Sequence, residues 1–246
     1  MKPLTVMILM SILSSTFSLS KDYEKDVIKT SEGDLVITFI GHGTLMFEFK
    51  GMVIHIDPTM READYKDMPD ADLILVTHQH GDHLDITAIN HILKKDCEAV
   101  MTPVCLENLE DFNQAVIMKN GDKKTIKGIQ IEAIPAYNIE HKRNNGTPYH
   151  PKGEGNGYIL TFGDTRVLVA GDTENIPEIK ALKDIDIAFL PMNLPYTMTP
   201  EMVADAAKAF RPSILYPYHY GNTDTDELVK LMEAEKDIEV RIRELQ

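Results

Sequence analysis

The sequence predicts an α/β protein built from two β-sheets, each covered by helices. Short β-rich segments separated by turn residues fill the first half of the chain, whereas helices and strands alternate in the last third. A meander followed by such alternation is typical of two packed sheets with helices outside. The chain has 246 residues, of which 43% are hydrophobic, and neither a linker nor a sequence repeat divides it. These values favour one globular domain.

The first 20 residues have the pattern of a signal peptide. Lys2 is followed by an apolar run over residues 4–13, and Ser18-Leu19-Ser20 fits a cleavage site flanked by small residues. The run is shorter than the ~20 residues that span a bilayer. We therefore expect residues 1–20 to be removed and residues 21–246 to form the domain. The mature protein is expected to be periplasmic or secreted, without a membrane span.

The first half of the domain is expected to be mainly strand, with two helices. Asp85 can cap a helix whose apolar residues recur at helical spacing from Ile86 to Leu93. A second short helix is expected over residues 106–112. The strands are short β-rich segments between turn signals, expected at residues 35–40, 45–49, 52–56, 73–76, 99–101, 115–118 and 129–134.

In the second half, two strands flank the turn at Gly163-Asp164 before helices alternate with strands. Thr199 followed by Pro200 is a good start signal for a helix. Two further helices are expected near residues 177–182 and 226–235. Strands are expected at residues 158–162, 166–170, 187–190, 213–216 and 239–242. The stretch from Asn138 to Asn156 has no periodicity, and loops of this length are often functional.

Charge and cysteine usage restrict the partners and the covalent chemistry. A formal net charge of −14 repels phosphate backbones, so we expect a small-molecule substrate and no nucleic-acid partner. Cys97 and Cys105 lie on either side of the strand expected at residues 99–101. An extended segment separates its ends by ~3.3 Å per residue, which disfavours a disulfide between these two cysteines. We therefore expect two buried free thiols.

The motif with the clearest chemistry is His78-Gln79-His80-Gly81-Asp82-His83, directly after the apolar run 73–76. Sites in α/β proteins tend to lie at the carboxyl ends of strands. Neutral imidazole and carboxylate groups suit Zn²⁺ and similar divalent ions. In an extended turn His78 and His80 point the same way and can share one ion. Asp82 and His83 then face another side, where a second ion can bind.

This motif resembles the signature of the metallo-β-lactamase superfamily. The resemblance is strongest to its lactonase-like and N-acyl-phosphatidylethanolamine phospholipase-like branch, and it implies a four-layer αββα sandwich of two mixed sheets flanked by helices. Supporting motifs follow in the family's order through most of the mature chain: Gly41-His42-Gly43-Thr44, Ile56-Asp57-Pro58, Gly171-Asp172-Thr173 and Tyr218-His219-Tyr220-Gly221.

The resemblance implies a ligand set for two divalent ions. His78 and His80 match ligands of the first ion, whereas Asp82, His83 and His219 match ligands of the second. Asp172 matches the carboxylate that bridges both ions. The third ligand of the first ion is either His150 or His141, and His150 fits the family's spacing better.

The resemblance also implies the chemistry of this centre. Zinc is the expected metal, with manganese or iron as alternatives, and two ions ~3.5–4 Å apart lower the pKa of a water between them toward ~7. The resulting bridging hydroxide is the expected nucleophile. Asp82 is the expected catalytic residue, which orients the nucleophile and accepts its proton.

Four further residues are candidates for supporting the ligands or contacting substrate. Asp57 is expected to accept a hydrogen bond from a ligating imidazole, because the strands 52–56 and 73–76 end at one sheet edge if they run parallel. His42 either has a similar role or is simply a turn residue between two glycines. Asn138 and Asn193 are candidates because they lie next to motifs. The charged run from His141 to Arg143 is interpreted as either an anion contact or a solvated face.

These features together predict a metal-dependent hydrolase that cleaves an ester-like bond in a lactone, a phosphoester, a carboxylic ester or an amide. The alternative is a non-hydrolytic metal-binding or redox protein on the same fold. Hydrolysis of β-lactams is less favoured, because the motifs at His42 and Asp57 resemble the lactonase-like branch.

Overall fold

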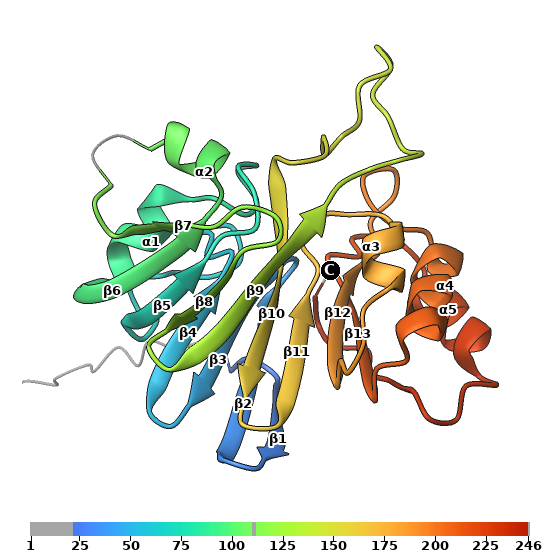
Figure 1. The fold of residues 1–246 in the computed structure, drawn as a ribbon, viewed down its shortest axis with the longest axis horizontal. Helices are drawn as coiled ribbons and strands as arrows, with labels where there is room; N and C mark the ends of the chain where they lie inside the picture. Colours follow the sequence, from blue (N-terminus) through green and yellow to red (C-terminus); the bar gives the residue numbers. More distant parts are fainter. Residues whose placement is uncertain (1–21, 110–111, 246) are drawn as a thin grey trace, which may run out of the picture.

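The computed structural model describes residues 22–109 and 112–245, which fold into two facing seven-stranded sheets (Figure 1). The first sheet contains, in spatial order, β1 (Lys25–Thr30), β2 (Gly33–Gly41), β3 (Thr44–Phe49), β4 (Met52–Ile56), β5 (Ala71–Leu75), β6 (Leu93–Met101) and β7 (Ala115–Ile117). The second contains, in the same sense, β8 (Lys123–Ile126), β9 (Ile129–Ala136), β10 (Gly155–Phe162), β11 (Thr165–Val169), β12 (Ile187–Pro191), β13 (Ile214–Tyr218) and β14 (Glu239–Val240).

Both sheets follow the same pattern of strand directions. β1 to β4 and β8 to β11 are antiparallel meanders, whereas β4 to β7 and β11 to β14 are parallel. The structure therefore contains a repeat that the sequence does not show. Because β4 and β5 are parallel neighbours, the segments that follow them leave the sheet at one edge, as predicted for Asp57 and His78.

Helices cover the outer face of each sheet, so the predicted four-layer αββα sandwich is confirmed (Figure 1). The first sheet is covered by α1 (Ile86–Ile92) and α2 (Pro103–Glu107), and the second by α3 (Pro177–Lys180), α4 (Pro200–Phe210) and α5 (Thr225–Met232). Asp85 caps α1 by accepting hydrogen bonds from Thr87 N and Ala88 N. Thr199 caps α4 in the same way through Met202 N.

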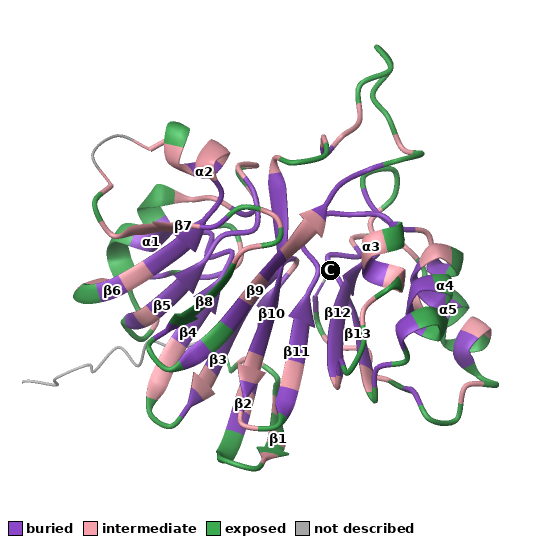
Figure 2. Ribbon diagram, in the orientation of Figure 1, coloured by how far each residue is buried: buried purple, intermediate pink, exposed green. Residues whose placement is uncertain are grey.

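Aromatic side chains fill the space between the sheets. Phe39 and Phe47 of the first sheet meet Phe162, Phe189 and Tyr216 of the second, with ring centroids 5.2–6.3 Å apart. The central strands are buried along most of their length, whereas the β9–β10 loop projects into solvent (Figure 2). This packing fixes the edge of both sheets at which the histidines gather.

Some predicted elements differ from the structure. β1 and β8 were not predicted, because their mostly exposed or half-buried residues lack an apolar pattern. The helix expected at residues 106–112 is α2, which begins earlier because Thr102 caps it and Pro103 takes its first position. Cys97 and Cys105 are buried and unbridged, as predicted. The predicted signal peptide lies outside the described residues and stays a prediction. Among the described residues, no helix is long and apolar enough to cross a bilayer.

Asp26 of β1 binds the C-terminal segment. Removing this carboxylate should therefore lower the free energy of unfolding substantially. Its oxygens accept hydrogen bonds from Tyr216 Oη, from Arg241 Nη1 at 3.1 Å, and from Arg243 Nη2 at 2.9 and 2.8 Å. Because two guanidinium groups would lose a largely buried partner, Asp26→Ala should lower the free energy of unfolding by about 3 kcal/mol.

Chemical denaturation of the variant measures this loss. Asp34→Ala is the matched control, since Asp34 forms an exposed ion pair with Lys29 on the same hairpin and should cost less than about 1 kcal/mol. Equal losses in the two variants would contradict the assigned role of Asp26.

His55 predicts a distinct pH dependence of stability. It is fully buried on β4, its Nε2 donates to Pro69 O at 3.0 Å, and its Nδ1 has no partner. Burial lowers the pKa of His55 from 6.5 to about 4. As the pH falls, the unfolded chain therefore binds this proton before the folded chain does, and stability is lost between pH 6.5 and about pH 4.

Between pH 6.5 and about pH 4, the titration of His55 alone should lower the free energy of unfolding by about 3 kcal/mol. Unfolding at pH 7 and pH 4 measures it as the difference between the wild type and His55→Gln, because Gln does not titrate. If the two proteins lose the same stability between these pH values, His55 is not held neutral.

Candidate metal centre

The predicted site residues gather at the edge where the parallel strands of both sheets end. His78 to His83 follow β5, Asp57 follows β4, Asp172 follows β11 and His219 follows β13. The turn between β2 and β3 adds His42, and the loop before β10 adds His150. The chain thus brings nine candidate residues from six separate segments to one end of the sandwich.

Asp172 is the centre of this cluster. Its carboxylate lies 3.1 Å from His150 Nε2, 3.5 Å from both His83 Nε2 and His219 Nε2, and 3.9 Å from His78 Nε2. Burial disfavours a charge at this position, yet the imidazoles of His219, His83 and His150 hold the pKa of Asp172 well below its ordinary value. Asp172 is therefore a buried carboxylate shared by four histidines. Its role as a bridge between two ions stays a prediction.

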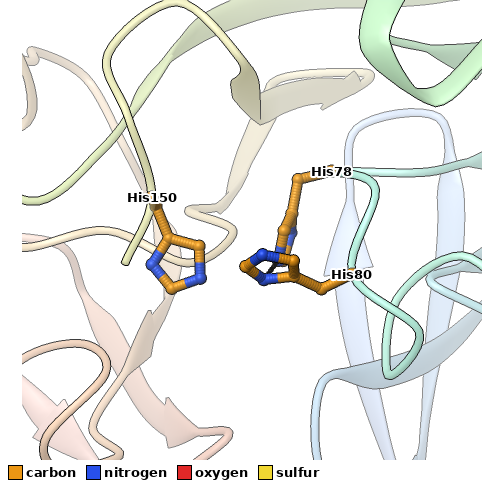
Figure 3. Close-up of side chains that lie close together, drawn as sticks. All are labelled: His78, His80 and His150. Carbon is orange, nitrogen blue, oxygen red and sulfur yellow. Dashed lines mark hydrogen bonds between the residues drawn. The ribbon is translucent and has the colours of Figure 1, made fainter. Parts of the chain in front are cut away.

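One group of candidate ligands consists of His78, His80 and His150. Their rings point toward one another from two separate loops (Figure 3). One nitrogen of each lies within 4.8 Å of the others, and His78 Nε2 is 3.0 Å from His80 Nδ1. This is the trio predicted for the first ion. His141, the alternative third ligand, instead bonds the Glu174 carboxylate through its Nδ1 at 2.9 Å.

A second group consists of His42, Asp82 and His219, and a third of His78, His83 and Asp172. Asp82 Oδ2 lies 3.7 Å from His42 Nε2 and 3.8 Å from His219 Nε2. Although burial opposes it, these imidazoles hold the pKa of Asp82 well below its ordinary value. His42, which the sequence left open between a turn residue and a supporting role, therefore lies with the candidate ligands.

Hydrogen bonds at the outer nitrogens orient two of the imidazoles. His83 Nδ1 lies 2.8 Å from Asp57 Oδ2, as predicted for Asp57, and His150 Nδ1 lies 2.7 Å from Asn138 Oδ1. Since both partners accept, each Nδ1 carries a proton, and each ring turns its Nε2 toward the centre. Asn138 therefore supports a candidate ligand, a role predicted only from its position beside a motif.

Unpaired buried atoms show that these residues fit a divalent cation. His83 Nε2, His219 Nε2 and Asp172 Oδ1 are buried without any hydrogen-bond partner, although they face one another. Lone pairs that converge on a carboxylate repel unless a cation lies between them. Nitrogen and carboxylate donors at such distances suit Zn²⁺ and similar ions.

Glycine and left-handed backbone make this convergence possible. A Cβ on Gly43 would lie 2.9 Å from His83 Cε1 and 3.4 Å from His219 Cδ2, so only glycine leaves both rings in place. His42, Asp57 and His219 have φ between 47° and 48°. Such conformations persist only where the surrounding structure imposes them, and they concentrate at functional sites.

Two supporting residues were not predicted from the sequence. Thr77 Oγ1 donates to Asp57 at 2.7 Å and lies 3.1 Å from His78 Nδ1. The buried carboxylate of Glu174 accepts from the backbone N–H groups of residues 139, 140 and 141, and from Asn138 Nδ2 at 3.1 Å. Their positions next to His78 and Asp172 were the only available signal.

Removing the charge of Glu174 should disturb the β9–β10 loop. In Glu174→Gln an NH₂ group replaces one oxygen and faces N–H donors, so the start of the loop and Asn138 lose their fixed position. We expect kcat/KM to fall about 10–100-fold with the fold retained. Steady-state kinetics and circular dichroism measure both effects. Glu140→Gln, an exposed carboxylate in the same loop, is the control and should stay near wild type.

A pocket of about 410 Å³ opens beside the candidate ligands. It is lined by His80, Gly81, Asp82, Arg143, Tyr149, His150, Asp172, Asn193, Tyr196 and His219. Asn193 thus lines this pocket, and its contact with substrate stays a prediction. A larger hollow of about 500 Å³ lies on the outer face of the first sheet and contains none of the candidate ligands. The site is therefore assigned by its chemistry rather than by the size of the cavity.

Comparison with known proteins agrees with this geometry. Residues 36–219, more than half of the chain, match the model of the beta-lactamase superfamily domain. The crystal structure of a metal-dependent hydrolase from Parabacteroides distasonis is 49% identical, with a TM-score of 0.86 over 92% of this chain and 100% of that chain. A metal-dependent hydrolase of Methanopyrus kandleri is 29% identical over 85% of this chain and 96% of its own length.

A more distant likeness concerns the fold alone. Igni18, a metallo hydrolase from Ignicoccus hospitalis, is 22% identical with a TM-score of 0.69. Taken with the histidine-rich centre, the relatives from Parabacteroides distasonis and Methanopyrus kandleri define the protein as a metal-dependent hydrolase. The chain belongs to the metallo-β-lactamase superfamily. Its assignment to the lactonase-like branch stays a prediction.

Proposed function

We propose that this hydrolase cleaves an ester-like bond with two divalent ions, zinc being the expected metal. His78, His80 and His150 would hold one ion, and Asp82, His83 and His219 the other, with Asp172 between them. The substrate would be a lactone, a carboxylic ester, a phosphoester or an amide. The observation that carries the proposal is the convergence of unpaired imidazole nitrogens on the Asp172 carboxylate.

Divalent ions in these groups would supply a nucleophile at neutral pH and stabilise the negative charge that develops on the attacked centre. The protein residues have separate tasks. Asp57 and Asn138 keep the Nδ1 protons of His83 and His150 in place, so that both rings offer Nε2 to a cation. This fixed tautomer prepares the site for cations before any substrate enters.

Asp82 is the residue that we propose to accept a proton during the reaction. It lines the pocket and its side chain is 32% exposed, whereas Asp172 is 4% exposed and enclosed by histidines. A carboxylate with one side open to the pocket can reach a proton on the nucleophile, which an enclosed carboxylate cannot do.

Hydrolysis of a small panel of substrates tests the proposal. The panel comprises a 4-nitrophenyl carboxylic ester, a lactone, a phosphodiester and a β-lactam, each assayed before and after chelation. We expect hydrolysis of at least one of the first three, loss of activity on chelation, and recovery with added zinc. His78→Ala should be inactive, whereas His91→Ala, an exposed histidine on α1, should retain activity. Equal hydrolysis by wild type and His78→Ala would refute the proposal.

A further inference from the structure

The mouth of the metal pocket is formed by two segments that the metal ligands do not require. One is the β9–β10 loop, which contributes Arg143 and Tyr149, and the other is the segment after β12, which contributes Asn193 and Tyr196. Asn138 joins the two segments, because its Nδ2 donates to Tyr196 O at 2.9 Å. The mouth is therefore fixed relative to the metal centre by the same asparagine that orients His150.

Arg143 occupies a defined position in this mouth. Arg143 N donates to Thr147 O at 2.8 Å and Gly146 N donates to Arg143 O at 2.8 Å, which closes a tight turn. The guanidinium lies over the Tyr149 ring, 5.0 Å from its centroid. Tyr149 in turn packs edge-on against Tyr196, with ring centroids 5.0 Å apart at 80°. These contacts limit the orientations that the arginine can adopt.

The charge of Arg143 is not neutralised within the part of the chain that the structure describes. Its guanidinium donates only to the backbone oxygen of Tyr149, at 3.5 Å, and it forms no ion pair with a described carboxylate. Among the residues that line the pocket, it is the only permanent cation. Arg143 is exposed to solvent at this mouth, in a chain whose formal net charge is −14. The sequence had left the same residue open between an anion contact and a solvated face.

We propose that the pocket takes substrates in which an anionic group accompanies the scissile bond, with the anion bound by Arg143. A carboxylate or a phosphate fits equally, because the planar guanidinium forms paired hydrogen bonds with either. The less polar part of such a substrate would lie against Tyr149 and Tyr196, whose rings form the adjoining wall. This inference rests on the proposed hydrolysis and specifies its substrate class.

Esters that share the 4-nitrophenolate leaving group but differ in charge test the inference. The anionic substrates are the mono-4-nitrophenyl ester of glutaric acid and the 4-nitrophenyl ester of a phosphonobutyric acid, and the neutral substrate is 4-nitrophenyl valerate. The wild type should favour at least one anionic ester in kcat/KM. Arg143→Gln should reduce the ratio of anionic to neutral kcat/KM about 10-fold or more. The two anionic esters distinguish the carboxylate from the phosphate class.

Two further variants separate charge from position. Lys142→Gln removes a neighbouring exposed cation that does not line the pocket, so it should leave the ratio at the wild-type value. Arg143→Lys keeps the charge without the planar fork and should recover part of the preference. An unchanged ratio in Arg143→Gln, or equal losses in Arg143→Gln and Lys142→Gln, would overturn the inference.

A binding measurement keeps the inference testable if the esters are not hydrolysed, an outcome that would count against the proposed function instead. The ligand is the mono-4-nitroanilide of glutaric acid, titrated by calorimetry into zinc-loaded wild type and Arg143→Gln. We expect about 10-fold weaker binding to the variant. Equal affinity for the two proteins would refute the anion site whether or not the enzyme hydrolyses esters.

Discussion

Asp172→Asn should lose about 10³-fold in kcat/KM together with most of its bound metal. The side chain keeps its shape but becomes neutral, and its NH₂ group would face imidazole nitrogens that now point at a carboxylate. One substitution thus removes the negative charge that four histidines share. Asp82, the other carboxylate among the candidate ligands, lies within 4 Å of the Nε2 atoms of two histidines, His42 and His219.

Elemental analysis and steady-state kinetics on the same preparation measure both losses. Glu178→Gln is the charge-matched control, since Glu178 lies on α3 and pairs with Lys152 away from the candidate ligands. The control should keep the metal content and activity of the wild type. Retention of metal and activity by Asp172→Asn would show that Asp172 is not the shared carboxylate.

Asp57→Asn should lower the affinity for metal about 10–100-fold. Asp57 is fully buried and accepts from Thr77 N at 2.8 Å, from Thr77 Oγ1 at 2.7 Å, and from His83 Nδ1 at 2.8 Å. An asparagine has one acceptor oxygen in place of two, so the Thr77 and His83 protons cannot all be accepted. The ring of His83 then loses the bond that holds its proton on Nδ1 and directs its Nε2 toward the centre.

Asparagine is chosen so that the substitution does not strain the backbone at this position. Asp57 has φ of 47°, a conformation that asparagine adopts readily. Competition with a chromophoric chelator measures the affinity, and Asp64→Asn in the exposed part of the following loop is the control. If both variants bind metal as the wild type does, Asp57 does not support His83.

One part of the centre was predictable because it is local, and the distant ligands because their motifs resemble those of a known family. His78 to His83 lie in one loop after an apolar strand, so the sequence alone places them together. The role of Asp57 followed from one assumption, that β4 and β5 run parallel, which the strand pairing confirms. The choice of His150 over His141 depended on the spacing in the family that the sequence resembles, and the structure places His150 with the candidate ligands.

The parts that escaped prediction depend on contacts between distant segments. Glu174 binds a loop more than 30 residues away, and no local pattern indicates which donors a carboxylate will meet. The pseudo-repeat of the two sheets is visible only in the strand directions. β8 was not predicted, because its first three residues are two lysines and a threonine, all exposed, and they do not alternate with apolar residues. Long-range packing, rather than local propensity, decided these features.

Metal content per chain tests the central claim most directly. Inductively coupled plasma mass spectrometry of the wild type and of His78→Ala, each purified under the same conditions and reloaded with zinc, gives the stoichiometry. We predict about two zinc ions per wild-type chain and a clear loss in His78→Ala, because His78 belongs to two of the three candidate groups. Fewer than one ion per wild-type chain, with no change in His78→Ala, would contradict a two-metal centre.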